Sequence, residues 1–172
     1  LIDDALSFDL TKLMFEGPTD ELQKTVNSQP AIMAMSLAAL ATLEEYRIQD
    51  SLKPAAYAGH SVGEYTSLVS SGVLDVEDGI RLVRERGRLM QKASDLREGG
   101  MAAIIGLDDI TVEEICQETG VEIANVNSDN QIVISGDRIS LARAMDFCAA
   151  RGARKTIPLA VAGAFHSHLM AP

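Results

Sequence analysis

Residues 99–159 read GGMAAIIGLDDITVEEICQETGVEIANVNSDNQIVISGDRISLARAMDFCAARGARKTIPL, and this stretch decides the fold. Apolar residues alternate in some parts of it and recur at helical spacing in others. The pattern predicts, in chain order, a strand at 101–107, a helix at 110–119, strands at 121–127 and 131–135, a helix at 139–151 and a strand at 153–159. This βαββαβ series predicts a ferredoxin-like subdomain over residues 100–159, with Gly99-Gly100 as its boundary.

The residues before this boundary are predicted to be mostly helical. Pro30 begins an apolar helix over 31–46, which we expect to be central and buried. An apolar run predicts a buried strand at 54–58. The other predicted elements are short surface helices within 1–26, a helix at 63–71 closed by Gly72 and a helix at 76–94 capped by Asp75. We assign 1–99 together with 160–172 to one larger α/β body.

Composition limits the class of protein. The chain has 172 residues, of which 47% are hydrophobic, enough for a packed core. Its formal net charge of −10 disfavours nucleic-acid binding, because phosphate groups repel an acidic surface. The longest apolar stretch, 31–43, is shorter than the ~18 residues that a transmembrane helix needs, so we expect no membrane span. Cys116 and Cys148 are few and far apart, which indicates free core thiols in a cytoplasmic protein.

Neither end of the chain has the features of a natural terminus. It starts without Met, and Leu1-Ile2-Asp3-Asp4 lacks the basic residues and long apolar run of a signal peptide. We therefore expect an internal piece of a longer protein. The spacing of its His and Cys residues fits no metal site, so no metal is expected.

Residues 59–63 form the pattern G-x-S-x-G between a predicted strand and a predicted helix. This context is typical of a nucleophile elbow, in which a serine lies on a tight, strained turn with small neighbours. Ser61 would be the nucleophile, and the backbone N–H of Val62 would point at the oxyanion that forms during attack. A simple glycine-flanked turn is the alternative interpretation.

A serine nucleophile needs a base, and the chain contains three histidines. His60 directly precedes Ser61 on the turn, so its side chain is expected to point elsewhere. His166 and His168 remain, and the pattern alone does not choose between them.

Arg86 lies on the apolar side of the helix predicted at 76–94. An arginine in this position has to reach solvent, pair with a carboxylate or bind an anionic ligand. An internal acidic partner such as Glu64 is therefore one interpretation, and an anionic substrate is the other.

Several stretches together resemble the malonyl-CoA:acyl carrier protein transacylase family, in the family's order and spacing. They are Gly59-His60-Ser61-Val62-Gly63-Glu64-Tyr65, Gln29-Pro30-Ala31, Arg86-Gly87-Arg88-Leu89-Met90-Gln91, Met101–Leu107, Asn125-Val126-Asn127-Ser128, Gln131–Gly136 and Gly163-Ala164-Phe165-His166-Ser167. The resemblance covers essentially the whole chain. It implies an α/β hydrolase-like body, present in part, with an inserted ferredoxin-like subdomain.

The resemblance also implies a role for each matching residue. Ser61 would be the acylated nucleophile and His166 its base. Arg86 would bind the free carboxylate of the malonyl group, and the N–H of Val62 would be one oxyanion donor. Gln29 would lie near the active site. His168 falls where the family varies and receives no role.

The activity implied by the resemblance is transfer of malonyl from malonyl-CoA to the phosphopantetheine thiol of acyl carrier protein, through a malonyl-serine intermediate. It would serve fatty acid or polyketide synthesis in a monomeric enzyme that binds no cofactor and uses the CoA thioester as substrate. The stretch Ala164-Phe165-His166 indicates malonyl rather than methylmalonyl. Two basic clusters are candidates for docking the carrier protein, namely Arg81, Arg84 and Arg88, and Arg151, Arg154 and Lys155.

Two other functions remain possible on the sequence. A serine esterase or thioesterase would use the same elbow, and a non-catalytic acyltransferase-like module would serve only for docking. The chain also lacks the family's G-Q-G-S-Q segment, which supplies a second oxyanion donor, and the downstream residue that orients the histidine. Loss of one donor typically costs about 10² to 10³ in rate, so we expect the isolated chain to be poorly active.

Overall fold

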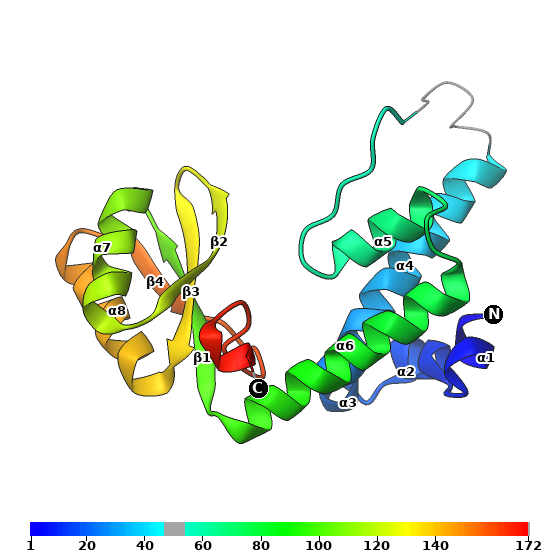
Figure 1. The fold of residues 1–172 in the computed structure, drawn as a ribbon, viewed down its shortest axis with the longest axis horizontal. Helices are drawn as coiled ribbons and strands as arrows, with labels where there is room; N and C mark the ends of the chain where they lie inside the picture. The colour runs from blue at the N-terminus through cyan, green and yellow to red at the C-terminus, as the bar shows by residue number, and fades with distance from the viewer. Residues whose placement is uncertain (47–53, 172) are drawn as a thin grey trace. The chain divides into compact units, whose positions relative to one another are not determined.

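The computed structural model describes residues 1–46 and 54–171, and the chain divides into two compact units (Figure 1). Unit 1 comprises Leu1–Leu89, and the regular secondary structure among its described residues is helical. Unit 2 comprises Met90–Pro172 and contains a four-stranded sheet. The long helix α6 (Val76–Leu96) contributes residues to both units.

Unit 1 is built around the buried side of α6. The helices before it are α1 (Ile2–Leu6), α2 (Leu10–Glu16), α3 (Thr19–Gln23), α4 (Thr25–Glu45) and α5 (Gly63–Ser70). Ile80 and Val83 of α6 are fully buried with Met33 of α4. Gly79 lets these helices approach closely, because a Cβ there would lie within 2.8 Å of both Met33 and Val69.

Helix α4 differs from the expectation in two ways. It begins at Thr25, so Pro30 lies inside the helix rather than at its start. The prediction that the helix is buried all round is wrong: burial is confined to its first half, and Met35 and Leu43 further along are 64% and 43% exposed. The neighbouring helices α2, α3 and α5 contact α4. On length and composition alone α4 is able to cross a membrane, a test that the core helix of a globular protein also passes.

The strand predicted at 54–58 is absent. Residues 54–60 are exposed and have no regular secondary structure. A strand is stable only when a neighbouring strand pairs with its backbone N–H and C=O groups, and the described part of unit 1 contains no other strand.

Unit 2 follows the predicted order of elements. Its strands and helices are β1 (Gly99–Ile105), α7 (Asp109–Thr119), β2 (Glu122–Ser128), β3 (Gln131–Asp137), α8 (Arg138–Ala150) and β4 (Lys155–Pro158). The sheet order is β2-β3-β1-β4, and all neighbouring strands are antiparallel. Gly106 adopts a φ of 86°, which ends β1 before the predicted residue 107. Asp108 and Asp137 cap α7 and α8 by accepting backbone N–H groups with their side chains.

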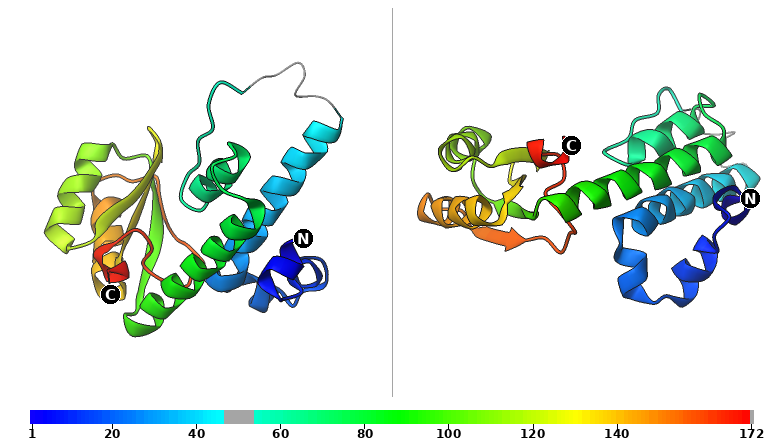
Figure 2. Two further views of the ribbon diagram at one scale, coloured as in Figure 1. Left: turned by 45° about the vertical axis from the view of Figure 1, so that its right-hand side comes forward. Right: turned by 60° about the horizontal axis from the view of Figure 1, so that its bottom comes forward.

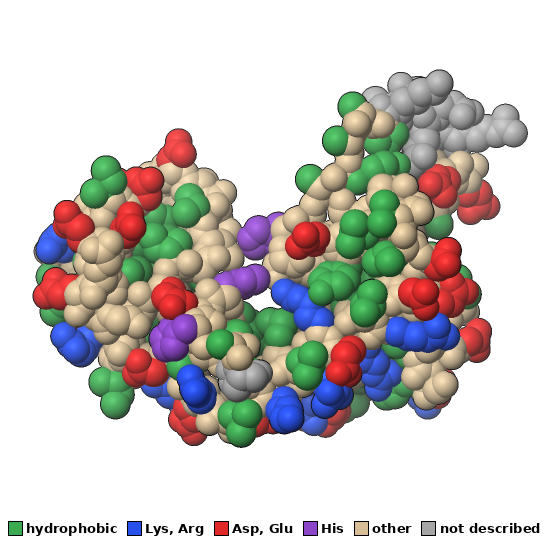
Figure 3. All heavy atoms as spheres, viewed as in Figure 1, with side chains coloured by type: hydrophobic (Ala, Val, Ile, Leu, Met, Phe, Trp, Pro, Cys, Tyr) green, Lys and Arg blue, Asp and Glu red, His purple; other side chains and the backbone are tan. Residues whose placement is uncertain are grey.

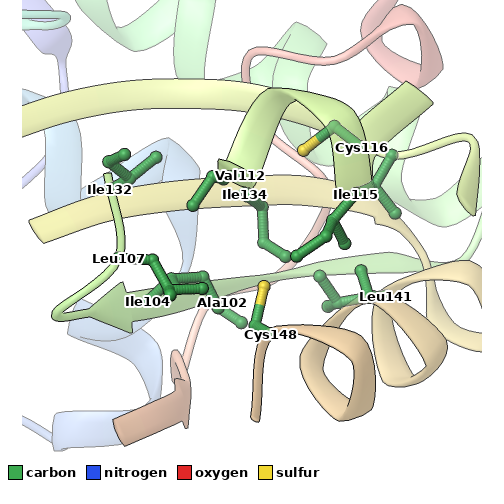
Figure 4. Packing of buried hydrophobic residues seen from close by; sticks show 12 residues of the cluster. Ala102, Ile104, Leu107, Val112, Ile115, Cys116, Ile132, Ile134, Leu141 and Cys148 are labelled. Atoms are coloured by element: carbon green, nitrogen blue, oxygen red, sulfur yellow. The ribbon is translucent and has the colours of Figure 1, made fainter. Parts of the chain in front are cut away.

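The two faces of this sheet have different partners. Helices α7 and α8 cover one face, as the two views of Figure 2 show. Register pairs Ala102 with Ile134 and Ile104 with Ile132, so these four side chains share that face and form the main core with the helices (Figure 4).

Cys116 and Cys148 lie in this core as free thiols, as the sequence predicts. Burial raises the pKa of Cys116 to about 12 and also raises the pKa of Cys148. Both thiols therefore stay protonated and act as packing residues.

The opposite face of the sheet receives the end of the chain. Phe165 and Leu159 pack against Met101, Ala103 and Val133 on this face. Ala164 and Leu169 contact Gly99, and the short 3₁₀ helix η2 (His168–Met170) follows. The observed division thus groups this segment with unit 2, whereas the predicted domains join 160–172 to the larger body.

Candidate active site

Ser61 lies on the turn that leads into α5. Its φ of 53° is left-handed, a conformation that residues with a Cβ rarely adopt. Gly59 makes the turn possible, because a Cβ at this position would lie 2.0 Å from the backbone of Gly63. Gly63, by contrast, has no atom within 4 Å of the position that its Cβ would take. The tight turn predicted around Ser61 is therefore present, and of its two glycines Gly59 is the one that packing requires.

Arg86 reaches this turn from α6. Its Nη2 donates to the Oγ of Ser61 at 3.1 Å, and its Nη1 donates to the Oε1 of Gln29, which is buried on α4. The structure therefore brings together three of the predicted site residues.

Gly87 explains how Arg86 reaches Gln29. A Cβ at Gly87 would lie 2.5 Å from the carbonyl oxygen of Thr25 and 2.9 Å from the Cα of Val26. The missing side chain lets the backbone of α6 lie directly on the first turn of α4, so that the guanidinium and the amide meet. The sequence analysis assigned no role to this glycine.

The two side chains that accept hydrogen bonds from Arg86, those of Gln29 and Ser61, are neutral. Glu64 is exposed, and the ion pairs among residues 1–46 and 54–171 do not include Arg86. The interpretation that pairs Arg86 with Glu64 therefore has no support in these contacts. A half-buried guanidinium beside a hydroxyl and an amide is suited to an anionic ligand, because a carboxylate matches two of its N–H groups at once.

Val62 follows Ser61 directly and begins the helical turn of α5. Its side chain packs on the core of unit 1. The use of its N–H as an oxyanion donor stays a prediction.

His166 belongs to unit 2, so its pairing with Ser61 also stays a prediction. Its φ of 59° is left-handed, like that of Ser61. The residues around it are well packed: Ala164 is fully buried, and Ser167 and Leu169 are each 8% exposed.

His168 has a partner that the sequence did not reveal. One oxygen of Glu122 accepts its backbone N–H at 2.8 Å, and the other lies 3.0 Å from its Nδ1. Glu122 precedes His168 by 46 residues, and no local pattern joins the two.

The basic clusters are partly neutralised. Arg88 forms a two-bond pair with Glu85, Arg81 pairs with Asp78, and Arg151 pairs with Glu114. Arg84 lies over the ring of Phe8 at 4.3 Å. Figure 3 shows acidic side chains interspersed with basic ones on the visible face of each unit.

No cluster for a metal ion exists among the described residues, where groups of three or more His, Cys, Asp or Glu side chains do not converge.

Comparison with known proteins identifies the family of this chain. The model of the acyl transferase domain matches residues 2–172. The malonyl CoA-acyl carrier protein transacylase of Haemophilus influenzae is 44% identical over 98% of the chain, and that of Bacillus subtilis is 41% identical over 99%. The chain spans 55% and 54% of these two proteins, about half of their length.

Solved structures agree with these relatives. The acyl-carrier-protein S-malonyltransferase of Bartonella henselae is 43% identical, with a TM-score of 0.91 over 98% of this chain and 55% of that one. A malonyl-transacylase in complex with its type II PKS acyl-carrier protein is 41% identical, with a TM-score of 0.88 over 98% of this chain and 55% of that one. Because the family model matches almost the entire chain, the chain belongs to the acyl transferase domain family.

Proposed function

We propose that the full-length protein transfers malonyl from malonyl-CoA to the phosphopantetheine thiol of acyl carrier protein, in fatty acid or polyketide synthesis. Membership of the acyl transferase family supports the reaction class. The relatives named malonyl CoA-acyl carrier protein transacylases support both substrates.

The contact between Arg86 and Ser61 is the observation that carries this proposal. The guanidinium lies 3.1 Å from the hydroxyl oxygen. In a malonyl thioester a single methylene separates the carboxylate from the reacting carbonyl carbon. A cation that binds the carboxylate must therefore lie beside the nucleophile, and Arg86 does. An acetyl thioester would leave the same guanidinium without an anion.

The first half-reaction acylates Ser61. His166 accepts the hydroxyl proton as the Oγ of Ser61 bonds to the thioester carbonyl carbon. The N–H of Val62 stabilises the negative oxygen of the tetrahedral intermediate. The C–S bond then breaks, and the sulfur of CoA leaves with the proton that His166 returns.

The second half-reaction reverses these steps with a different thiol. His166 removes the proton from the phosphopantetheine thiol, whose sulfur attacks the malonyl-serine carbonyl. The C–Oγ bond breaks, and the proton returns to Ser61. Arg86 holds the malonyl carboxylate throughout, with Gln29 fixing the guanidinium from its other side. Ser61, His166 and the thiols supply all the protons and electron pairs that these steps use, so we expect no bound cofactor.

The finer classification of the fold is part of the same proposal. We assign unit 2 to the ferredoxin-like class, which its βαββαβ order and antiparallel sheet support. The elbow at Ser61 supports a hydrolase-like body. We further propose a cytoplasmic, monomeric enzyme, to which the free core thiols are suited.

Mass spectrometry of the full-length protein tests the proposal. Brief exposure to malonyl-CoA is expected to add one malonyl group to the peptide containing Ser61, and adding acyl carrier protein is expected to remove it to the carrier thiol. A Ser61→Ala variant is the control and should remain unmodified. Absence of a malonyl adduct on Ser61, or hydrolysis to free malonate with no transfer to the carrier thiol, would refute the proposal; the second result would favour a thioesterase.

A further inference from the structure

The segment that carries His166 follows the last strand of unit 2 and has little regular structure of its own. Its helical part is the short helix η2. The left-handed backbone of His166 persists in a residue with a Cβ only where the surroundings fix it. The contacts on both sides of His166 therefore decide where its imidazole lies.

On the N-terminal side, packing fixes the chain. Ala164 is fully buried against Gly99, and Phe165 packs on the sheet face opposite α7 and α8, at Met101, Ala103 and Val133. These contacts are apolar and fix the chain up to Phe165.

On the C-terminal side of His166, hydrogen bonds fix the chain. The hydroxyl of Ser167 donates to the carbonyl of Ala164 at 2.7 Å and accepts the N–H of Leu169 at 3.3 Å. These bonds are local, so they shape the turn but do not tie it to the sheet.

Glu122 supplies a polar link from this turn to the sheet, beside the apolar contact of Leu169 with Gly99. It lies at the start of β2, and its two carboxylate oxygens bind one residue, His168, at the backbone N–H and at the ring. A fork with one arm on the backbone and one on the side chain restricts both the position and the rotation of His168. His168 lies two residues after His166.

We propose that Glu122 is a positioning residue for His166 and acts through His168. This inference rests on the proposed function, in which His166 is the base for Ser61. The carboxylate holds the C-terminal side of the turn on β2, and the turn in turn holds the imidazole of His166 in its working orientation. Neither Glu122 nor His168 touches the reacting atoms.

Hydrogen–deuterium exchange of the full-length protein tests the contact without using the reaction. In Glu122→Ala the amide of His168 loses its acceptor, and exchange in the peptide covering 163–171 is expected to accelerate. Glu122→Gln keeps one acceptor oxygen and should give an intermediate rate. The matched control is Glu118→Ala, which removes an exposed carboxylate of α7 and should leave this peptide unchanged. Equal exchange in the wild type and in Glu122→Ala would overturn the inference.

Single-turnover acylation by malonyl-CoA tests the consequence. Small displacements of a catalytic group are costly, so Glu122→Ala and His168→Ala should each lower the acylation rate constant by about 3- to 10-fold. The KM of this single turnover, taken as the half-saturating malonyl-CoA concentration for acylation, should not change, because the proposed binding site for the carboxylate is in unit 1. The double variant should be no slower than Glu122→Ala alone, since that substitution already removes both arms of the fork, the one on the backbone N–H and the one on the ring. Glu122→Gln should recover part of the loss.

The outcomes separate this inference from the proposed function. If the wild type is malonylated on Ser61 and Glu122→Ala is acylated at the wild-type rate, the positioning role is refuted and the transferase remains. Additive losses in the double variant, or an increase in KM without a decrease in rate constant, would also refute it. If the wild type forms no malonyl-serine, the proposed function fails and this inference fails with it.

Discussion

Ser61 and His166 share an unusual backbone conformation but are held in it by different forces. Both have φ between 50° and 60°, in the left-handed region. At Ser61 the cause is steric, because the backbone of Gly63 occupies the space beside Gly59. At His166 the causes are burial on either side and a set of hydrogen bonds. An added methyl group at Gly59 is therefore expected to abolish the conformation of Ser61 in one step. Removal of single hydrogen bonds near His166 is expected to weaken the conformation of that residue by degrees.

The largest effect is therefore expected at the steric site. In Gly59→Ala the new methyl would overlap the backbone of Gly63, so the turn has to open and malonylation of Ser61 should be lost. The matched control is Gly63→Ala, whose methyl meets open space in unit 1 and should leave malonylation near the wild-type level. Intact-protein mass spectrometry after a fixed exposure measures both. Comparable labelling of the two variants would show that close packing at Gly59 does not shape the turn.

The next largest effect is expected from removing the guanidinium of Arg86, which lies beside Ser61. Arg86→Ala removes the charge beside Ser61. Losing one partner of a desolvated ion pair costs about 3–5 kcal/mol, which predicts roughly a 10²- to 10⁴-fold loss in kcat/KM for malonyl-CoA. Arg86→Lys should recover a part of it, because an ammonium keeps the charge but not the two-pronged geometry. Steady-state kinetics with acyl carrier protein as acceptor give the values. Lys92→Ala, which removes an exposed cation of the same helix that lies outside both basic clusters, is the control.

A smaller effect is expected near His166, where hydrogen bonds hold the backbone. Ser167→Ala removes two hydrogen bonds that shape the turn around His166, each worth about 1 kcal/mol at most in a protein. Exchange of the Leu169 amide should therefore accelerate by about fivefold per kcal/mol lost, while the unfolding midpoint of the protein moves little. A change in the global midpoint with no change at Leu169 would contradict a local role.

The smallest effect is expected on stability, from the hydrogen bonds that cap helix N-termini, which also differ between the two units. The N-cap residues of α1 to α5 in unit 1 make no side-chain capping bond, whereas Asp137 caps α8 in unit 2. Bonds from the side chain and backbone of Ser140 hold the pKa of Asp137 below its usual range. Because the folded pKa is lowered, this stabilisation is present above the unfolded pKa and is lost as pH falls through the folded pKa.

Asp137→Asn isolates this contribution. Asn is an equally good N-cap, so stability at neutral pH should change by only a few tenths of a kcal/mol. The variant should lose less stability than the wild type as pH falls below about 4, where Asp is protonated. Urea unfolding at a series of pH values measures the difference. Identical pH dependence in both proteins would mean that the Asp137 carboxylate does not contribute.

Local patterns were sufficient where neighbours in sequence decide the structure. The patterns of apolar residues in unit 2 predicted its four strands and the helices α7 and α8 to within a few residues, because each of these elements has one side on the core. The short helix η2 was not predicted. The elbow at Ser61 follows from two glycines and a serine. Arg86 stood out because a cation lay on an apolar helix side, and the structure gives it Ser61 and Gln29 as partners.

Features that depend on distant partners were not predictable. The apolar run at 54–58 has the composition of a strand, but the described residues of unit 1 offer it no strand to pair with. The apolar sequence of α4 implied burial all round, whereas Met35 and Leu43 are exposed. The fork of Glu122 on His168 joins residues 46 positions apart, and only the sheet brings them together.

Competitive labelling tests the central claim most directly. The full-length protein is exposed briefly to equal concentrations of malonyl-CoA and acetyl-CoA, and the two adducts on the Ser61 peptide are compared by mass spectrometry. The account predicts malonyl-serine in large excess in the wild type and loss of that excess in Arg86→Ala, because the guanidinium beside the hydroxyl is what distinguishes the two acyl groups. Equal malonyl and acetyl adducts in the wild type, or an excess that survives in Arg86→Ala, would contradict it.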